Sequence, residues 1–571
     1  MSQQRVAVIG LDALEWWDLE RLIAQGTTPN LARLIDNSNV VRIESDMPYR
    51  AESIWTEFFT GRTRDENRYW TTALFDPASY ATWVIGAYRG NPFYARPDIV
   101  PVVLDLPHVA ISPESRGLQV TGWGAHSPQF PTASLPSPVA AEIDRTFGVN
   151  RAIHNDSHAG WHNPQYHAAL TEALIDGAAT KAKIVPWMLE RQPDWNLSIT
   201  VFTEPHVSGH QFWHGVDPSH LLHGTPEADR AGAQHDTVMS AVDTAVGSIV
   251  DSLPDGVEVV VMAAHGMQDN GSDVTGGVLL AELLHRHHFG RPLLDLGPFD
   301  PDDPPIVLPH ELQPADYLAD RIVEPRGTMN DHSAVPEATR RAMHWARQRR
   351  PDITRSTEEM VWKLSGKGDR ATWWEPRPRA EADPFVDLAR ATARRPLDYQ
   401  IPCWYRHRWP EMPAFVLPAF SDSHIRINLE GREAHGMVAA SDYARVLDET
   451  EALVRACTDA RTGEPIVDEI TRPRAANPYD PDGPTSDLVA SFRCASDAIR
   501  HPDLGVIGPS PLMRAGEHTP TGWVARRADG HTDHAERFGP YDIAPTLLDL
   551  AGLPSSPHHT GRSFVELLRP A

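Results

Sequence analysis

Two histidines four residues apart follow an apolar segment of the chain. Leu197 to Phe202 predicts a buried strand, and Pro205 then suits the first turn of a helix. His206 and His210 would therefore lie on one helical face, at a spacing that lets two imidazoles bind one metal ion. Two surface histidines are the alternative in a chain with 28 histidines, but the position directly after a strand favours a metal site.

An acidic residue closes the first apolar segment. Asp12 follows Val6 to Leu11, a run that is typical of a strand covered on both faces of a parallel sheet. Open α/β sheets bind their ligands at the carboxyl ends of such strands. We therefore expect Asp12 to lie at a ligand site.

Further segments resemble a known family. Gly26 to Leu34 and Ser53 to Gly61 are similar to the opening of the alkaline phosphatase superfamily, in its bacterial branch of type I phosphodiesterase and nucleotide pyrophosphatase-like proteins. Tyr541 to Pro554 resembles the closing helix of that superfamily. In the family the Asp of the first strand binds a catalytic metal, and the resemblance gives this role to Asp12.

The resemblance extends to the segment with the two histidines. The family places a metal-binding Asp four residues before a metal-binding His, and here the Asp position is His206 while His210 matches. His518 resembles the last metal ligand of the family, in a late Gly-x-His segment. A turn histidine in a Gly-rich hairpin is the alternative for His518.

The next strand ends in a segment with one match and one departure. His265 matches a metal ligand of the superfamily, whereas Ala264 stands where the superfamily has a ligand Asp. A methyl group cannot coordinate a metal. The resemblance therefore implies that this part of the site has lost ligands.

The nucleophile position also departs from the family. Counting back nine residues from Thr60 gives Ala51 where the family has a metal-bound Thr or Ser. The nearest hydroxyl is Ser53, at the expected start of a helix over Ile54 to Phe59, where the helix dipole favours an anion or an alkoxide. A plain N-cap is the alternative role for Ser53.

These residues imply one firm metal site and one weak one. His206, His210 and His518 form a set of three nitrogen ligands that suits zinc with an open fourth position, with Fe(II), Mn(II) and Co(II) as alternatives. The other set keeps only Asp12 and His265. We expect one tightly bound metal and a second that is absent or depends on substrate.

The elements that must position these groups indicate a doubly wound, mostly parallel α/β sheet flanked by helices, with the alkaline phosphatase-like core that the resemblance implies. Strands such as Val257 to Met262 alternate with helical patterns such as Leu170 to Arg191. Residues 290–400 are Pro-rich and predict an insertion or cap. The expected organisation is a first part of the core over 1–289, the insertion over 290–400, and a second part over 401–571 with strands near 415–418, 425–429 and 522–525.

Composition limits the partners. The 571 residues can bury a large core, and the net charge of −25 disfavours a nucleic-acid backbone or an anionic membrane as a partner. A small anionic substrate stays compatible, because a metal supplies positive charge locally. Three unspaced cysteines support neither a disulfide framework nor a Cys-based zinc site. The sequence shows no signal peptide and no membrane-spanning run, so we expect a cytoplasmic protein of unknown oligomeric state.

We therefore predict a metal-dependent hydrolase of a phosphodiester, pyrophosphate or related anionic ester. A water activated by the metal, or the Ser53 hydroxyl, would attack the anionic centre, and Asn270 could hydrogen-bond an oxyanion. Two alternatives stay open: a metalloenzyme for non-hydrolytic tailoring of a small metabolite, and a non-catalytic metal- or ligand-binding member of the superfamily.

Overall fold

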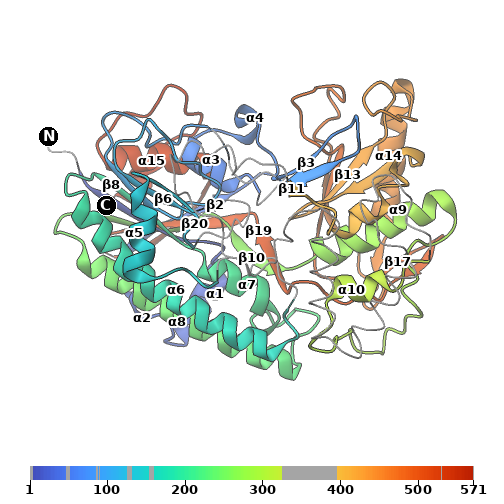
Figure 1. Ribbon diagram of the computed structural model, residues 1–571, viewed down its shortest axis with the longest axis horizontal. Helices are drawn as coiled ribbons and strands as arrows, with labels where there is room; N and C mark the ends of the chain where they lie inside the picture. Colours follow the sequence, from blue (N-terminus) through green and yellow to red (C-terminus); the bar gives the residue numbers. More distant parts are fainter. Residues whose placement is uncertain are drawn as a thin grey trace, which may run out of the picture.

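The computed structural model describes residues 4–46, 52–84, 88, 90–124, 132–152, 160–323, 395–528 and 530–569. Ala51 and residues 324–394 of the predicted insertion lie outside this range. The chain forms a larger lobe around a mixed sheet and a smaller lobe with its own sheets (Figure 1). Within the described residues no helix is both long and apolar enough to cross a bilayer.

A nine-stranded sheet forms the centre of the larger lobe. Five neighbouring strand pairs are parallel and three are antiparallel, so that the described sheet is mostly parallel, as predicted. The strands in their order across the sheet are β21 (Thr532–Phe538), β2 (Ser38–Glu44), β20 (Thr521–Arg527), β9 (Glu258–Ala263), β1 (Val6–Leu11), β8 (Leu197–Phe202), β5 (Pro101–Leu104), β6 (Leu118–Thr121) and β7 (Ala133–Leu135).

Alternate side chains of β1 enter two separate cores. Ile9 and Leu11 pack in one cluster and Val6 and Val8 in another, so that helices cover both faces of the sheet. This explains why β1 is apolar at every position, and it confirms the doubly wound arrangement. The first face is covered by α1 (Trp16–Ala24), α2 (Pro29–Ile35), α5 (Pro138–Phe147), α6 (Pro164–Arg191) and α8 (Pro226–Ser252), and the second by α3 (Ile54–Thr60), α15 (Ile543–Leu550) and α16 (Val565–Leu568) (Figure 1).

The smaller lobe has a core of its own. Its residues come largely from 274–318 and 401–512, and they include Trp409, Phe415 and Leu429. Its described residues form a four-stranded sheet, two three-stranded sheets and three helices. The strands of the four-stranded sheet are, in order, β12 (Ala414–Leu417), β13 (Ser423–Ile427), β16 (Leu488–Phe492) and β15 (Val467–Thr471). One three-stranded sheet consists of β14 (Thr458–Asp459), β17 (Ile499–His501) and β18 (Gly505–Ile507), and the other of β11 (Arg395–Pro396), β4 (Thr82–Val84) and β3 (Ala73–Phe75). The helices are α9 (Leu280–Phe289), α10 (Pro314–Ala319) and α14 (Tyr443–Arg455).

The second part of the chain does not re-enter the main sheet at residue 401, which differs from the expected organisation. The strands predicted near 415–418 and 425–429 form, as β12 and β13, but they pair with β16 and not with the main sheet. Their apolar side chains fill the core of the smaller lobe. The chain returns to the main sheet only at β20, the strand predicted near 522–525.

A short antiparallel ladder lies between the two lobes (Figure 1). β10 (Gly266–Asp269) follows directly after the end of β9, and it pairs with β19 (Gly516–Thr519), which leads into β20. Met267 is paired with His518 in this ladder. The ladder therefore brings a residue from late in the chain to the carboxyl end of β9.

Candidate metal centre

Three predicted ligands follow three adjacent strands. β1 is parallel to both β8 and β9, so the carboxyl ends of these strands lie at one edge of the sheet. Asp12 comes directly after β1, His265 comes two residues after β9, and His206 lies in α7 (Glu204–Phe212), which follows β8. The edge predicted from the sequence is therefore the place where the candidate ligands meet.

Asp12 is fully buried and lies between two imidazoles. Its Oδ1 atom is 3.2 Å from Nε2 of His265, and its Oδ2 atom is 3.4 Å from Nδ1 of His206. Trp55, on the first turn of α3, donates a hydrogen bond from Nε1 to Oδ1 of Asp12 at 3.0 Å. The carboxylate is thereby held in one orientation by groups from three elements.

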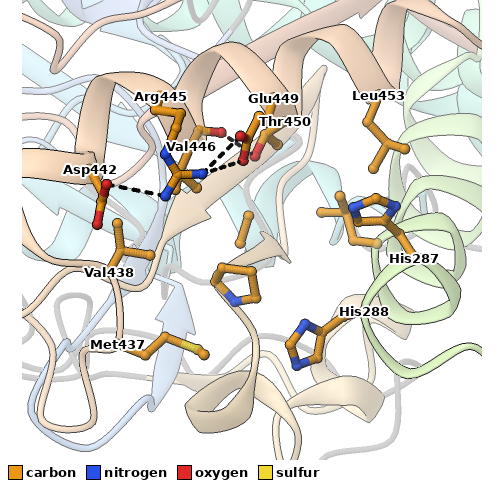
Figure 2. Close-up of a pocket in the computed structure, with 13 residues that line it drawn as sticks. His287, His288, Met437, Val438, Asp442, Arg445, Val446, Glu449, Thr450 and Leu453 are labelled. Carbon is orange, nitrogen blue, oxygen red and sulfur yellow. Dashed lines mark hydrogen bonds and ion pairs between the residues drawn. The ribbon is translucent and has the colours of Figure 1, made fainter.

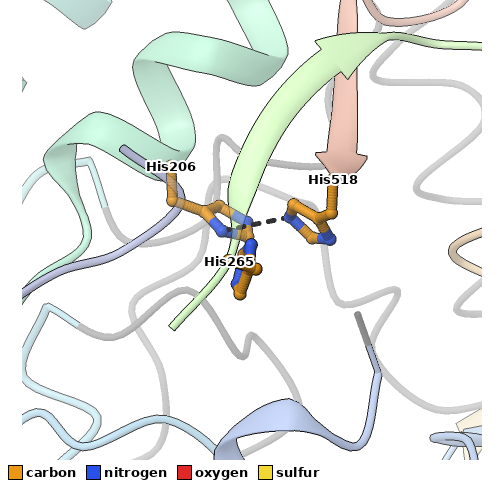
Figure 3. Close-up of side chains that lie close together, drawn as sticks. All are labelled: His206, His265 and His518. Carbon is orange, nitrogen blue, oxygen red and sulfur yellow. Dashed lines mark hydrogen bonds between the residues drawn. The ribbon is translucent and has the colours of Figure 1, made fainter. Parts of the chain in front are cut away.

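His518 reaches the same cluster from β19. Its Nε2 atom lies 3.3 Å from Nδ1 of His206, and its ring centroid lies 4.4 Å from that of His265. Figure 3 shows the three imidazoles converging from α7, from the segment after β9 and from β19. One nitrogen from each of His206, His265 and His518 lies within 4.8 Å of the others, a grouping that can hold a metal ion.

His210 lies beside this group. Its ring centroid is 4.6 Å from that of His206 and 4.8 Å from that of His518. Its Nδ1 atom lies 2.6 Å from the carbonyl oxygen of Gly516, and this bond fixes the ring. A metal-binding histidine is commonly held in this way, with one ring nitrogen on a carbonyl group and the other directed at the metal.

Two glycines permit this close approach of α7 to the ladder. A Cβ atom on Gly209 would lie 2.5 Å from Cε of Met267, and one on Gly516 would lie 2.5 Å from the carbonyl oxygen of Gly209. A side chain at Gly516 would push β19 away from α7, because it would meet backbone, whereas one at Gly209 would require the Met267 side chain to move. The contact between His210 and Gly516 therefore depends on Gly516 being a glycine.

The structure brings all five predicted metal ligands into one cluster. The sequence divided them into a set of His206, His210 and His518 and a weaker set of Asp12 and His265. One grouping of nitrogens joins members of both sets, because His518 lies beside His265 as well as beside His206. The rings of the predicted set His206, His210 and His518 also lie within 4.8 Å of one another, between centroids. The division into two sites stays a prediction.

Ser53 does not cap α3. It precedes Ile54, but its side chain accepts no hydrogen bond from the helix, and its Oγ atom is fully buried without a hydrogen-bond partner among the described residues. Ser53 therefore stands at the N-cap position of α3 without the side-chain bond of an N-cap, and its role stays a prediction. A buried hydroxyl without a partner is destabilising in an apolar site, so this position requires another explanation.

Asn270 has internal partners for its amide group. Its Nδ2 atom donates to Oδ2 of Asp273 at 2.9 Å and to the carbonyl oxygen of Gly516 at 3.3 Å, and its Oδ1 atom accepts from the backbone N–H of Asp273. These bonds hold the end of the ladder. A role of Asn270 in binding substrate stays a prediction that requires one of them to break.

A buried chain of polar groups anchors α7 from the side opposite the cluster. Ser208 lies between the two histidines of α7 in sequence, and its Oγ atom is 2.8 Å from Nδ1 of His235 on α8. Nε2 of His235 lies 2.9 Å from Oδ2 of Asp18 on α1. Burial alone would raise the pKa of Asp18, but His235 and Arg21 lower it, so the carboxylate stays charged.

The sequence did not indicate this anchor or the bond from Trp55 to Asp12. Each joins residues that lie more than 25 positions apart and have no recognisable spacing. The sequence pointed only to the segments that contain these residues. Trp55 lies in a segment that resembles the family, and Ser208 lies in the segment with the two histidines.

The comparisons with known proteins identify the family. Residues 6–368 match the model of type I phosphodiesterase / nucleotide pyrophosphatase, more than half of the chain. The chain therefore belongs to this family of phosphoester hydrolases. No curated protein matches the sequence at a significant level.

Several solved structures are similar over nearly the whole chain. The wild-type alkaline phosphatase PafA has 10% identity and a TM-score of 0.47, with 99% of each chain covered. Murine ectonucleotide pyrophosphatase / phosphodiesterase 5, an inactive variant in complex with AMP, has 10% identity and a TM-score of 0.45, again over 99% of each chain. Phosphonoacetate hydrolase from Sinorhizobium meliloti 1021, in complex with phosphonoformate, has 13% identity and a TM-score of 0.43 over 96% of each chain.

Proposed function

We propose that this protein is a metal-dependent hydrolase of phosphodiesters, pyrophosphates or related anionic esters. The observation that carries the proposal is the convergence of His206, His265 and His518 beside Asp12, at the carboxyl ends of adjacent strands. The chain belongs to a family of phosphoester hydrolases, and the cluster is the place where its candidate ligands meet.

The donor set fits a divalent transition metal. It contains four imidazoles and one carboxylate, and all of these side chains are buried except for the partly buried His518. Nitrogen-rich sites of this kind suit zinc, and iron, manganese and cobalt are alternatives. A metal held by these residues would act as a Lewis acid toward a phosphoryl oxygen.

The residues of the chain hold the reacting groups in place. Trp55 and His265 orient the carboxylate of Asp12, and the bond from His210 to Gly516 fixes one imidazole toward its neighbours. The anchor through Ser208 and His235 keeps α7 from shifting. Such preorganisation lowers the free energy needed to bring substrate and nucleophile together.

Ser53 is the proposed nucleophile of the chain. Its hydroxyl group has no hydrogen-bond partner among the described residues, and it precedes the helix whose first turn contacts Asp12 through Trp55. In the attack the Ser53 oxygen would form a bond to phosphorus, and the leaving-group oxygen would depart with the electrons of its bond and take up the serine proton. Water would then hydrolyse the phosphorylated serine and restore the hydroxyl group. A water molecule as nucleophile is the alternative, and Ser53→Ala distinguishes the two.

Metal content and activity test the proposal. We expect about one tightly bound transition metal per chain, by elemental analysis of untagged protein, and loss of both metal and diesterase activity in His518→Ala. His287→Ala is the matched control, because His287 is exposed and lies in the smaller lobe. Full metal content in His518→Ala, or no metal after metal-supplemented expression, would contradict the proposal.

Substrate preference gives a second test. Because Ala51 and Ala264 stand at the family's nucleophile and ligand positions, we expect slow turnover of nitrophenyl phosphate and faster turnover of bis-nitrophenyl phosphate. Turnover of the monoester as fast as that of the diester would contradict this preference, but it would not contradict the proposed metal site.

A further inference from the structure

A cavity at the far end of α3 is lined in part by basic residues. Its volume is about 590 Å³, and its basic residues are Arg62, Arg96, His558 and His559. No carboxylate is among its described lining residues. Arg62 has no carboxylate partner among the described residues, so its positive charge is not balanced there, and such a charge favours anions.

The cavity is separate from the metal centre. It borders Thr60 at the end of α3, whereas Trp55 on the first turn of the same helix contacts Asp12. The seven residues of α3 span about 10 Å. The loop that carries His559 is attached here, because the backbone N–H of Thr560 donates to the carbonyl oxygen of Gly61 at 3.0 Å.

Two nitrogen atoms at this cavity are buried and have no hydrogen-bond partner among the described residues. They are Nε of Arg62 and Nδ1 of His559. Buried polar atoms of proteins almost always have partners, and an unmet one indicates a ligand or a water molecule. Burial lowers the pKa of His559, and the charges of Arg96, His558 and Arg62 lower it further, as expected for positive groups close together without an anion.

The nearby carboxylates do not pair with Arg62. Asp98 binds Arg96 at 2.6 Å and so balances the charge of that cavity residue, and Glu114 accepts from Asn91 at 2.9 Å. Glu66 lies close enough to be influenced by the charge of Arg62, but its Oε2 atom accepts from Thr560 at 2.6 Å and from Thr63. The guanidinium group of Arg62 makes no direct ion pair with any described residue.

The cavity of the smaller lobe shows the contrast. It has a volume of about 270 Å³ and lies between α9 and α14. There Arg445 bonds to Glu449 at 2.8 Å and to Asp442 at 3.2 Å (Figure 2). The charge of Arg445 is balanced within the fold, as that of Arg96 is, whereas Arg62 has no such carboxylate partner among the described residues.

We propose that the cavity formed by Arg62, Arg96, His558 and His559 is a binding site for a small multiply charged oxyanion, such as a phosphate ester. Arg62 would donate charge-assisted hydrogen bonds to its oxygens, and Arg96, which is paired with Asp98, would border the ligand. The rings of Tyr88 and Phe93 give the cavity an apolar wall that could contact the organic part of the ligand. This site is independent of the proposed catalytic function, because none of its residues belongs to the metal cluster.

Inorganic pyrophosphate, titrated calorimetrically, tests the proposal. Binding is measured first in His518→Ala, which weakens any binding at the metal centre, and it should be retained there. Arg62→Gln in this background should weaken it about tenfold, and Arg62→Gln/Arg96→Gln should weaken it further. The control is Arg33→Gln/Arg230→Gln in the same background, which removes the same charge from exposed positions of other helices.

Each outcome decides the matter. Retention in His518→Ala and loss in the Arg62 variants, with unchanged binding in the control, supports the site. Equal affinity of the Arg62→Gln/Arg96→Gln protein and the control overturns it, as does absence of millimolar binding in His518→Ala. Because Arg96 also bonds to Asp98 and to the carbonyl oxygen of Pro554, the single variant Arg62→Gln keeps the test valid if the double variant fails to fold.

Discussion

The indole of Trp55 donates a hydrogen bond to the carboxylate of Asp12, and so joins the start of α3 to the end of β1. Asp12 is the first predicted metal ligand of the chain, and the donor fixes its Oδ1 atom beside His265. A group that orients a metal ligand influences metal affinity without touching the metal. The effect of the Trp55 hydrogen bond on metal affinity can therefore be tested without changing any of the candidate ligands.

Trp55→Phe keeps a large ring and removes the N–H donor. We expect metal affinity to fall about tenfold or more, because Asp12 loses the bond that orients it, and we expect the free energy of unfolding to fall by about 1–2 kcal/mol. Competition with a chelator measures the affinity. Trp70→Phe is the matched control, because its Nε1 atom donates to Asp65 outside the cluster. Equal losses of metal affinity in both variants would show that Trp55 has no special role.

His206 can be replaced in two ways that separate loss of a ligand from change of a ligand. His206→Ala should release the metal and abolish activity. His206→Asp restores the carboxylate that the family resemblance places here, and it should still bind metal, with a preference shifted toward harder ions such as manganese. Elemental analysis after growth with each metal measures the shift. Full occupancy by metal in His206→Ala would remove His206 from the ligand set.

Ser53→Ala tests the buried hydroxyl. Since Oγ of Ser53 neither caps α3 nor bonds to any described residue, its removal should not lower the free energy of unfolding and should raise it by about 1 kcal/mol. Metal content should stay constant, and the rate of diester hydrolysis should fall by orders of magnitude. Ser38→Ala is the control, because that buried hydroxyl donates to the carbonyl oxygen of Leu34 and its loss should be destabilising by about 1 kcal/mol. Normal turnover in Ser53→Ala would leave water as the nucleophile.

Asp269 should make stability depend on pH. Burial raises the pKa of Asp269 to about 8, with further contributions from the charges of Asp217 and Glu517. The folded state therefore holds a proton that the unfolded state releases near pH 4, so this contribution to stability is complete below about pH 4 and is lost as the pH rises toward 8. The slope for one group is at most about 1.4 kcal/mol per pH unit.

Asp269→Asn should remove this dependence. Denaturant unfolding between pH 5 and pH 8, expressed as the free energy of unfolding, should show a smaller loss of stability in the variant than in the original protein. Asp255→Asn, at an exposed turn, is the control. An unchanged slope in Asp269→Asn would mean that Asp269 is already ionised at neutral pH.

Local patterns were sufficient for the parts of the site that lie on single elements. Leu197 to Phe202 forms β8 with the predicted bounds, and His206 and His210 lie on the helix predicted after it. Apolar periodicity determines such elements because burial acts on each segment separately. The same reasoning identified the strands near 415–418 and 425–429, but alternation indicates only that a strand has a buried face and not which sheet it joins.

Contacts between distant segments could not be predicted in this way. The hydroxyl of Ser53 was open to interpretation as a cap until the backbone of α3 showed that no cap bond forms. The anchor from Ser208 through His235 to Asp18 joins three helices, and no spacing in the sequence relates them. These interactions depend on how helices pack, which a single sequence specifies only through the complete fold.

The ladder of β10 and β19 has a consequence for the order in which the protein matures. It pairs Met267 with His518, residues separated by some 250 positions, so the imidazole cluster has a very high contact order. A chain still on the ribosome, before β19 has emerged, has Asp12, His206, His210 and His265 but lacks His518. Metal binding would then be a late step that follows the synthesis of β19, and products truncated before β19 would not bind the metal.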